Sequence, residues 1–95
     1  MFAKLTGKID DIFEDSIILD VNFVGYKIFT SKKNLDQLRS SNENNQSFYI
    51  ETVVREDYIH LYGFASIEEQ SLFNIFCKIN GEVAKLPSKF LASPL

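Results

Sequence analysis

The chain has 95 residues, enough for one compact domain, or for one small domain and the beginning of another. Apolar residues make up 45% and charged residues 24% of the sequence, which are ordinary values for a globular protein and argue against a disordered tail. The formal net charge of −3 argues against DNA binding spread over the whole surface, because phosphates are neutralised by surplus Lys and Arg, so any DNA-binding face must be local.

Five short strands with one helix are expected in the first two thirds of the chain. Alternating apolar residues, β-branched residues and intervening turn residues indicate the strands. They are 3–13, 16–21, 24–30, 48–54 and 58–62. Gly7 lies inside the first, and glycine within a strand often marks a bulge or a barrel corner. A helix over 32–39 with Ser31 as its N-cap completes the arrangement of an OB-type barrel, although periodicity alone also fits other small barrels.

Two further segments have distinct patterns. The stretch from Ser40 to Ser47 is rich in Ser, Asn and Gln and predicts a flexible loop. After Phe64 the period changes to that of a helix, which begins with a capping box at Ser66 to Glu69 and is expected to end at Asn80-Gly81. Its predicted apolar stripe consists of Leu72, Phe73, Phe76 and Ile79.

The sequence offers no set of residues for catalysis or for metal binding. His60 and Cys77 are the only residues of their types, and no nucleophile–base pair, Cys pair or Cys/His cluster can be assembled. We expect His60 to be an ordinary sheet-face histidine and Cys77 to be a packing residue, in a protein that is not an enzyme and needs no cofactor. The single cysteine and the lack of a signal-peptide core or a membrane-spanning run favour a cytoplasmic protein.

Two charged segments each allow two interpretations. Glu56 and Asp57 follow Arg55 in a tight turn, where the carboxylates either solvate the turn and discourage edge pairing or repel phosphates and part DNA strands. Arg55 either pairs with these carboxylates or reaches a phosphate. The segment from Asn80 to Lys85 is either a plain helix end with a solvated lysine or a turn whose amides bind a phosphate.

Five groups of residues, in their order and spacing, resemble the bacterial RuvA family. They are Leu5-Thr6-Gly7, Val24-Gly25-Tyr26, Val53-Val54-Arg55-Glu56-Asp57, Leu61-Tyr62-Gly63-Phe64 and the segment from Leu72-Phe73 to Asn80-Gly81. The resemblance extends from Met1 to about Gly81. The hairpin Val-Val-Arg-Glu-Asp followed by Leu-Tyr-Gly-Phe is its most specific part.

The resemblance implies an OB-type domain over 1–64 and a partial, degenerate helix-hairpin-helix segment over 65–95. It implies a homotetrameric subunit that binds four-way (Holliday) junction DNA in recombination and repair and recruits a hexameric ATPase motor, without hydrolysing anything itself. Glu56 and Asp57 would form an acidic pin at the centre of the junction-binding face. The implied phosphate-gripping turn consists of Asn80, Gly81, Ala84 and Lys85.

After Gly81 the sequence departs from the family pattern. The family hairpin reads Asn-Gly-Val-Gly, a small residue and Lys, but here Glu82 and Val83 occupy its third and fourth positions. Glutamate adds negative charge beside the phosphate path, and β-branched valine is poorly suited to positive φ. Pro87 falls in the first turns of the expected second helix, and family members are roughly twice as long. A second hypothesis is therefore a truncated remnant, a decayed or frame-shifted copy, that keeps only a folded, self-associating barrel and does not bind DNA.

Overall fold

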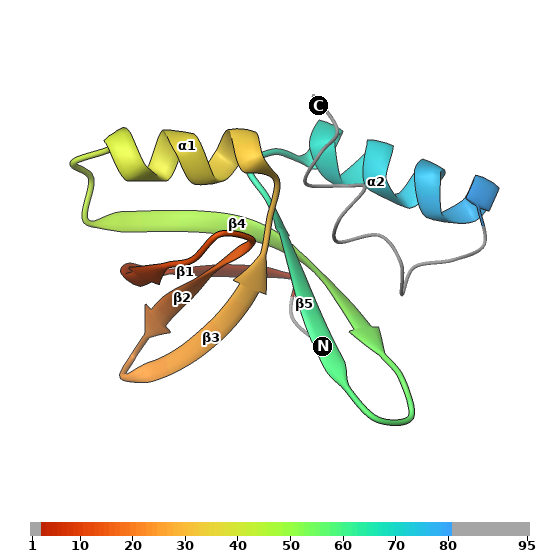
Figure 1. Ribbon diagram of the computed structural model, residues 1–95, viewed down its shortest axis with the longest axis horizontal. Helices are drawn as coiled ribbons and strands as arrows, with labels where there is room; N and C mark the ends of the chain where they lie inside the picture. The colour runs from red at the N-terminus through yellow and green to blue at the C-terminus, as the bar shows by residue number, and fades with distance from the viewer. Residues whose placement is uncertain (1–2, 81–95) are drawn as a thin grey trace.

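A closed five-stranded barrel with two helices forms the part of the chain that the computed structural model describes, residues 3–80 (Figure 1). The elements are β1 (Lys4–Ile12), β2 (Ser16–Val21), β3 (Val24–Phe29), α1 (Lys32–Ser40), β4 (Asn45–Val54), β5 (Ile59–Phe64) and α2 (Ile67–Asn80). The strand order is β1-β2-β3-β5-β4, and β4 pairs with β1 to close the barrel. Only the β3–β5 pairing is parallel. The predicted OB-type barrel is confirmed.

The barrel encloses an apolar core to which all five strands and α1 contribute. Its buried members are Leu5, Ile17, Leu19, Ile28, Leu35, Phe48, Ile50 and Leu61. Ile17 and Leu19 alternate with half-buried residues along β2, as expected for a strand with one face inside a barrel. α1 is amphipathic and buries Leu35 in the same core, while the Ser31 hydroxyl accepts a hydrogen bond from the Asn34 amide and caps the helix as predicted.

Gly7 lies where β1 and β2 approach each other closely. A Cβ atom at this position would overlap the carbonyl oxygen of Asp20 and lie 2.9 Å from Cγ2 of Val21. The register between β1 and β2 shifts between Ile9 and Asp11, so the bulge that a strand glycine suggested lies further along the strand than Gly7 itself. Glycine is therefore required at position 7 for close packing of backbones.

β4 begins earlier than the sequence predicted. The expected loop over 40–47 ends before Asn45, because residues 45–47 form ladder pairs with β1. Ser47 lies opposite Thr6, and their hydroxyl oxygens are 2.8 Å apart. Pairing through the backbone does not require apolar side chains, so closure of the barrel outweighs the polar composition of this segment.

The turn between β2 and β3 holds two residues in the left-handed region. Val21 and Val24 pair, and between them Asn22 has φ 51° and Phe23 has φ 71°. This is the backbone of a type I′ hairpin turn, in which Asn-Gly is the preferred pair. Asn22 tolerates the conformation, but Phe23 does not, and its side chain is fully exposed.

Replacing Phe23 with glycine is expected to stabilise the protein. Phe23→Gly removes the steric cost of a bulky residue at positive φ and sacrifices no buried contact, because the ring is 100% exposed. We expect the midpoint of thermal unfolding to rise by about 4 °C after the entropy cost of glycine is deducted. Circular dichroism melts would measure it, and an unchanged or lower midpoint would contradict the assignment of strain to this turn.

α2 begins where the capping box predicted, with one bond placed differently. The Glu69 amide donates to Ser66 Oγ at 3.1 Å, as in a capping box, but the Glu69 carboxylate accepts from the Ala65 amide at 3.3 Å. Of the predicted apolar stripe only Phe73 is buried, whereas Leu72 and Phe76 are exposed, and the side chain of Ile79 lies outside the described part. α2 thus contacts the barrel through a narrower face than its sequence indicates.

Within the described residues, no helix has the length and apolar character needed to span a membrane.

Candidate nucleic-acid interface

The acidic turn lies at the end of a two-stranded ribbon. β3 pairs with β5 only at Leu61 and Tyr62, whereas β4 and β5 pair with each other as far as Val54 and Ile59. The hairpin therefore extends beyond the rest of the barrel, as Figure 1 shows at its lower right. The turn is closed by the Arg55 amide, which donates to the Tyr58 carbonyl oxygen at 2.8 Å.

Glu56 and Asp57 are both exposed at this tip, and Arg55 does not pair with them. The Arg55 guanidinium donates to the Val54 carbonyl oxygen at 3.1 Å. The one ion pair recorded for residues 3–80 joins Arg39 to Asp36, far from this turn in the sequence. Of the two interpretations of Arg55, pairing with the neighbouring carboxylates is therefore not seen. The turn presents two adjacent carboxylates to the solvent.

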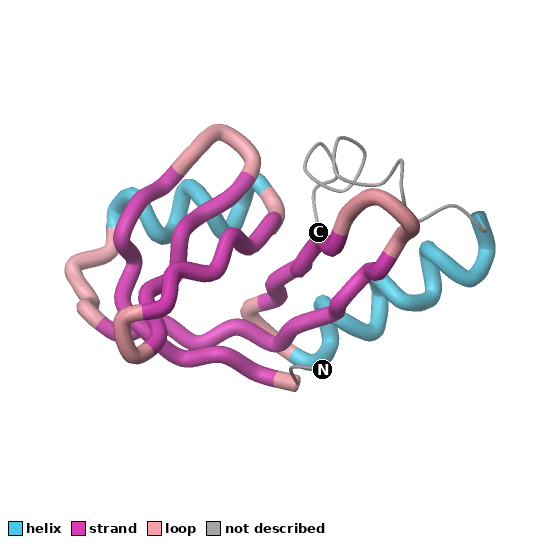
Figure 2. Tube along the Cα trace, turned by 90° about the horizontal axis from the view of Figure 1, so that it is seen from below, coloured by secondary structure: helices cyan, strands magenta, loops and turns pink. Residues whose placement is uncertain are grey.

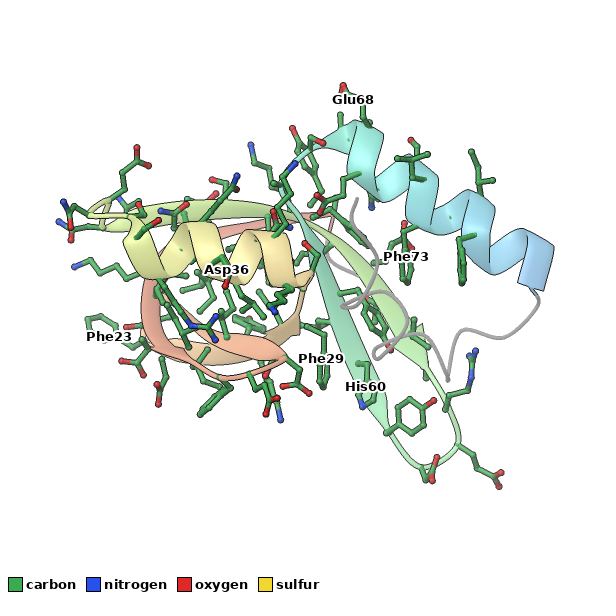
Figure 3. The ribbon with its side chains drawn as sticks, turned by 45° about the horizontal axis from the view of Figure 1, so that its top comes forward. Phe23, Phe29, Asp36, His60, Glu68 and Phe73 are labelled. Atoms are coloured by element: carbon green, nitrogen blue, oxygen red, sulfur yellow. The ribbon has the colours of Figure 1, made fainter. Side chains whose placement is uncertain are left out.

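A row of aromatic rings connects the ribbon to α2. The ring centroids are 4.2 Å apart for Tyr58 and His60, 4.8 Å for His60 and Phe29, and 5.8 Å for Phe29 and Tyr62. Tyr62 in turn lies 5.3 Å from Phe73 of α2. Figure 3 shows Phe29 and His60 side by side below Phe73. His60 is half-buried in this row, as expected for a sheet-face histidine.

The aromatic row stiffens a ribbon that would otherwise be weak. An isolated two-stranded hairpin is marginally stable, and each aromatic pair adds about 0.5–1.5 kcal/mol beyond the area it buries. Figure 2 shows α2 running beside the ribbon, and the buried Val53, Tyr62, Phe64 and Phe73 form the second core cluster between them. The two carboxylates are thereby held in a defined position relative to α2.

The opposite face of the ribbon carries exposed apolar residues. Val54 and Ile59 form a cross-strand pair and are 59% and 66% exposed. A ribbon with one packed face and one exposed apolar face is suited to contact with another molecule.

The predicted phosphate-gripping turn falls almost wholly outside the described residues. Asn80 is the last residue of α2, and its side chain is not among those described. Gly81, Ala84 and Lys85 lie outside the described residues, as do Glu82, Val83, Pro87 and the Cys77 side chain. The structure therefore places the helix that leads into this turn, and not the turn. Among the described residues, no three His, Cys, Asp or Glu side chains converge on a possible metal position.

The comparisons with known proteins address the family directly. The family model described as RuvA N terminal domain matches residues 1–63, more than half of the chain. The chain belongs to the RuvA family. RuvA proteins from Rickettsia bellii, Rickettsia felis and Rickettsia akari, each named Holliday junction branch migration complex subunit RuvA, are 42%, 43% and 44% identical to it over 93 residues. These alignments cover 98% of this chain and 45% of each relative, so the chain spans about half the length of the RuvA proteins it matches.

The RuvA match does not end with the barrel. An alignment over 93 residues continues past Gly81, where the sequence departs from the family hairpin. The chain therefore remains similar to these RuvA proteins beyond that point.

The sequence did not reveal the whole of this interface. Tyr58, His60 and Tyr62 alternate along one strand, and this spacing was a visible sign of a shared face. Phe29 comes from another strand, and its place beside His60 depends on the short parallel pairing of β3 with β5. No local pattern predicts that pairing.

Proposed function

We propose that the chain is a four-way-junction DNA-binding subunit of a branch-migration complex, acting in recombination and repair. The observation that carries the proposal is the exposed Glu56–Asp57 pair at the end of a ribbon on a barrel of the RuvA family. Phosphates are repelled by these carboxylates, so a continuous duplex is disfavoured at the turn. A junction opened at its crossover leaves room there for the turn, which keeps the strands apart.

Affinity for DNA must come from groups other than the acidic pair, because repulsion of phosphates disfavours some DNA shapes but does not bind any of them. Arg55 is exposed beside the turn and forms no ion pair with the neighbouring carboxylates, which leaves its charge for a phosphate. The second set in the proposal is the turn after α2, with Asn80, Gly81, Ala84 and Lys85 donating backbone amides and one positive charge. In this proposal 1–64 is the OB-type domain and 65–95 begins a helix-hairpin-helix segment.

The proposal includes self-association as a homotetramer and a hexameric ATPase motor as partner. The exposed Val54–Ile59 pair supports self-association, because apolar surface on a small domain is favourably buried against a second copy. The motor supplies the chemistry in this proposal, and the chain supplies recognition of the junction without a catalytic site or a cofactor of its own.

A titration against two DNA shapes tests the proposal. The purified chain is mixed with a four-way junction and with a linear duplex of the same sequence, at several salt concentrations, and bound DNA is resolved by gel shift. We expect tighter binding to the junction and a linear fall of log affinity with log salt. Equal affinities for the two shapes, or affinity that does not respond to salt, would count against it.

A second candidate is a folded, self-associating barrel that does not bind DNA. The net charge of −3 and Glu82 within the proposed phosphate-binding turn favour it. Light scattering of the same preparation distinguishes the two: oligomers without a gel shift would support this candidate, and oligomers that shift the junction would support the first.

A further inference from the structure

We propose that Asn34 of α1 and Glu69 of α2 form a latch that sets the orientation of α2 on the barrel. We further propose that both are positioning residues for DNA contact by the segment that follows α2, and this second step rests on the proposed function. The latch joins two helices that are distant in the sequence, and no sequence pattern in either helix predicts it.

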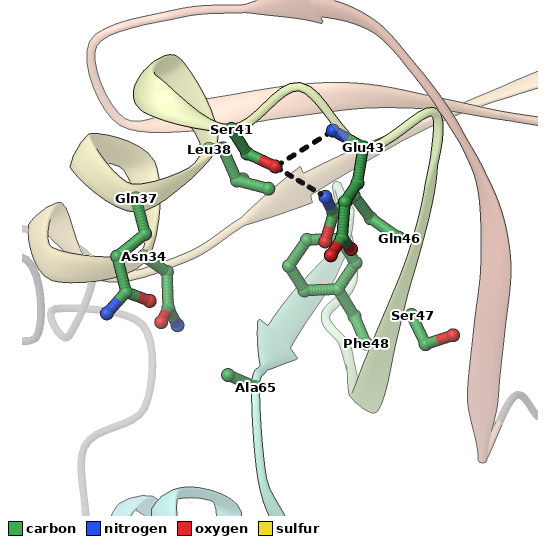
Figure 4. A pocket seen from close by; sticks show the side chains of 9 residues that line it. All are labelled: Asn34, Gln37, Leu38, Ser41, Glu43, Gln46, Ser47, Phe48 and Ala65. Atoms are coloured by element: carbon green, nitrogen blue, oxygen red, sulfur yellow. Dashed lines mark hydrogen bonds between the residues drawn. The ribbon is translucent and has the colours of Figure 1, made fainter.

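The latch is the end of a buried chain of hydrogen bonds. Asn34 is 4% exposed, and its Nδ2 donates to Glu69 Oε1 at 2.8 Å and to Thr30 Oγ1 at 3.0 Å. The Thr30 hydroxyl in turn donates to the carbonyl oxygen of Gly63 in β5 at 2.7 Å. Both amide hydrogens of Asn34 are therefore used, and neither can be lost without leaving a buried polar group unpaired. Figure 4 shows Asn34 and Ala65 lining one hollow beside α1.

Glu69 connects the latch to the start of α2. Its carboxylate accepts from Asn34 and also from the Ala65 amide in the segment that enters α2, while its own amide is bound by Ser66 Oγ. One carboxylate thus fixes the start of the helix and its contact with α1 together. A hydrogen bond to a charged group is stronger than one between neutral groups, so this contact contributes more to holding α2 in place than a bond between two neutral groups of the same length would.

The rest of the attachment of α2 combines one buried ring with polar contacts to β4. The Phe73 ring packs against Tyr62 and Phe64, at centroid distances of 5.3 and 4.9 Å. Gln70 donates to the Ile50 carbonyl oxygen at 3.4 Å, and Gln70 and Asn74 donate to Glu51 Oε1 at 3.0 and 3.3 Å. The latch adds the contact with α1, so that α2 is held on two sides of Phe73.

No other charge competes for the Glu69 carboxylate within the described residues. The remaining charged side chains of the two helices, as far as they are described, are exposed, and the one recorded ion pair joins Arg39 to Asp36. They are Lys32, Lys33, Asp36, Arg39 and Glu68. Asp36 and Glu68 are labelled in Figure 3, where Glu68 points away from the barrel. The amide of Asn34 is the side-chain partner of Glu69.

A small change at the latch becomes a large displacement at the far end of α2. At 1.5 Å per residue, Asn80 lies about 16 Å along the helix axis from Glu69. A rotation of about 10° at the latch would move the carboxyl-terminal end of α2 by about 3 Å. That distance is enough to break a hydrogen bond between a backbone amide and a phosphate.

Asn34→Asp tests the latch by placing two carboxylates against each other. The two carboxylates repel each other and the hydrogen bond from Asn34 Nδ2 to Glu69 Oε1 is lost, so α2 should loosen. Hydrogen–deuterium exchange of the α2 backbone amides is expected to quicken about tenfold at neutral pH. Asn42→Asp adds the same charge in an exposed loop and is expected to leave α2 protected.

A second variant separates the latch from general destabilisation. Adding Glu69→Gln to Asn34→Asp restores a donor and an acceptor between the two helices but not the bond to Thr30, so α2 should regain part of its protection at neutral pH. Three results would each overturn the latch. The exchange of α2 amides could be unchanged in the single variant, or protection could be lost equally in α2 and in all five strands. Alternatively, the double variant could show no recovery in α2 although the barrel stays protected.

The same variants decide whether the latch positions DNA contacts. In the gel-shift titration, Asn34→Asp is expected to weaken junction binding about tenfold at neutral pH, with partial recovery in the double variant. Loosened α2 with unchanged junction affinity would refute the positioning role. Absence of junction binding by the unmodified chain would refute the proposed function instead, and the exchange experiment would still decide the latch.

Discussion

Neutralising the acidic turn by Glu56→Gln together with Asp57→Asn is expected to raise the affinity for linear duplex DNA about tenfold and to remove most of the preference for a junction. Two unit charges 4 Å apart in water interact by about 1 kcal/mol, so two repulsive contacts correspond to about 2 kcal/mol, or about thirtyfold, which screening by salt lowers toward tenfold. Junction affinity should change less, since the turn lies at the open crossover. Fluorescence anisotropy titrations with both DNA shapes measure the ratio, and the effect should shrink at high salt.

The β1–β2 turn offers a matched control. Glu14 and Asp15 are also an adjacent acidic pair, and Glu14→Gln with Asp15→Asn makes the same change in net charge. Asp15 accepts a hydrogen bond from Ser16 Oγ at 2.9 Å, which an amide oxygen can also accept, so the turn should persist. The ratio of junction to duplex affinity should stay unchanged in this control. If the control raised the affinity for duplex DNA as much as the change at Glu56 and Asp57 does, the net charge of the protein would explain the effect, and the position of the acidic turn would not.

Local patterns were sufficient to predict most of the barrel. β-branched and aromatic residues mark β2, β3, β4 and β5, and the Ser31 cap and the turn at Glu56-Asp57 were readable because each depends on neighbours within a few residues. The start of β4 could not be predicted from such patterns, because Asn45 joins the sheet through its backbone, opposite β1. A polar segment takes up strand structure when a partner strand has no other neighbour, and composition carries no sign of that.

The hydrogen bond between Asn34 and Glu69 shows a second limit. Glu69 was recognised as a helix-capping residue, but its partner Asn34 lies in another helix and reads locally as an ordinary polar side chain. A buried hydrogen bond between distant residues exists only after the barrel has brought α1 and α2 together. The same holds for Phe73, whose stripe companions Leu72 and Phe76 are exposed because polar contacts on both sides of Phe73 fix the rotation of α2.

Replacing Gly7 with alanine is expected to destabilise the barrel by about 3 kcal/mol and to lower the midpoint of thermal unfolding by more than about 10 °C. The added methyl group would overlap the carbonyl oxygen of Asp20, a backbone atom that cannot rotate away, and would lie 2.9 Å from Val21 Cγ2. β1 would have to move away from β2, although it pairs with β4 on its other side, so the strain reaches the closure of the barrel. Thermal and urea unfolding followed by circular dichroism measure the loss.

Gly25→Ala supplies the control for the general effect of removing a glycine. A Cβ atom at Gly25 would meet only Ile18 Cγ2 at 3.1 Å, a side-chain methyl group that has to give way by a few tenths of an ångström. Glycine-to-alanine exchange also restricts the unfolded chain, which is worth about 0.4–1 kcal/mol in favour of the folded state at both positions. We therefore expect a change smaller than about 1 kcal/mol for Gly25→Ala. Similar decreases in the free energy of unfolding for both variants would contradict this prediction. They would indicate that both glycines are needed for their backbone freedom, and that the close approach of β1 to β2 does not explain the need for glycine at position 7.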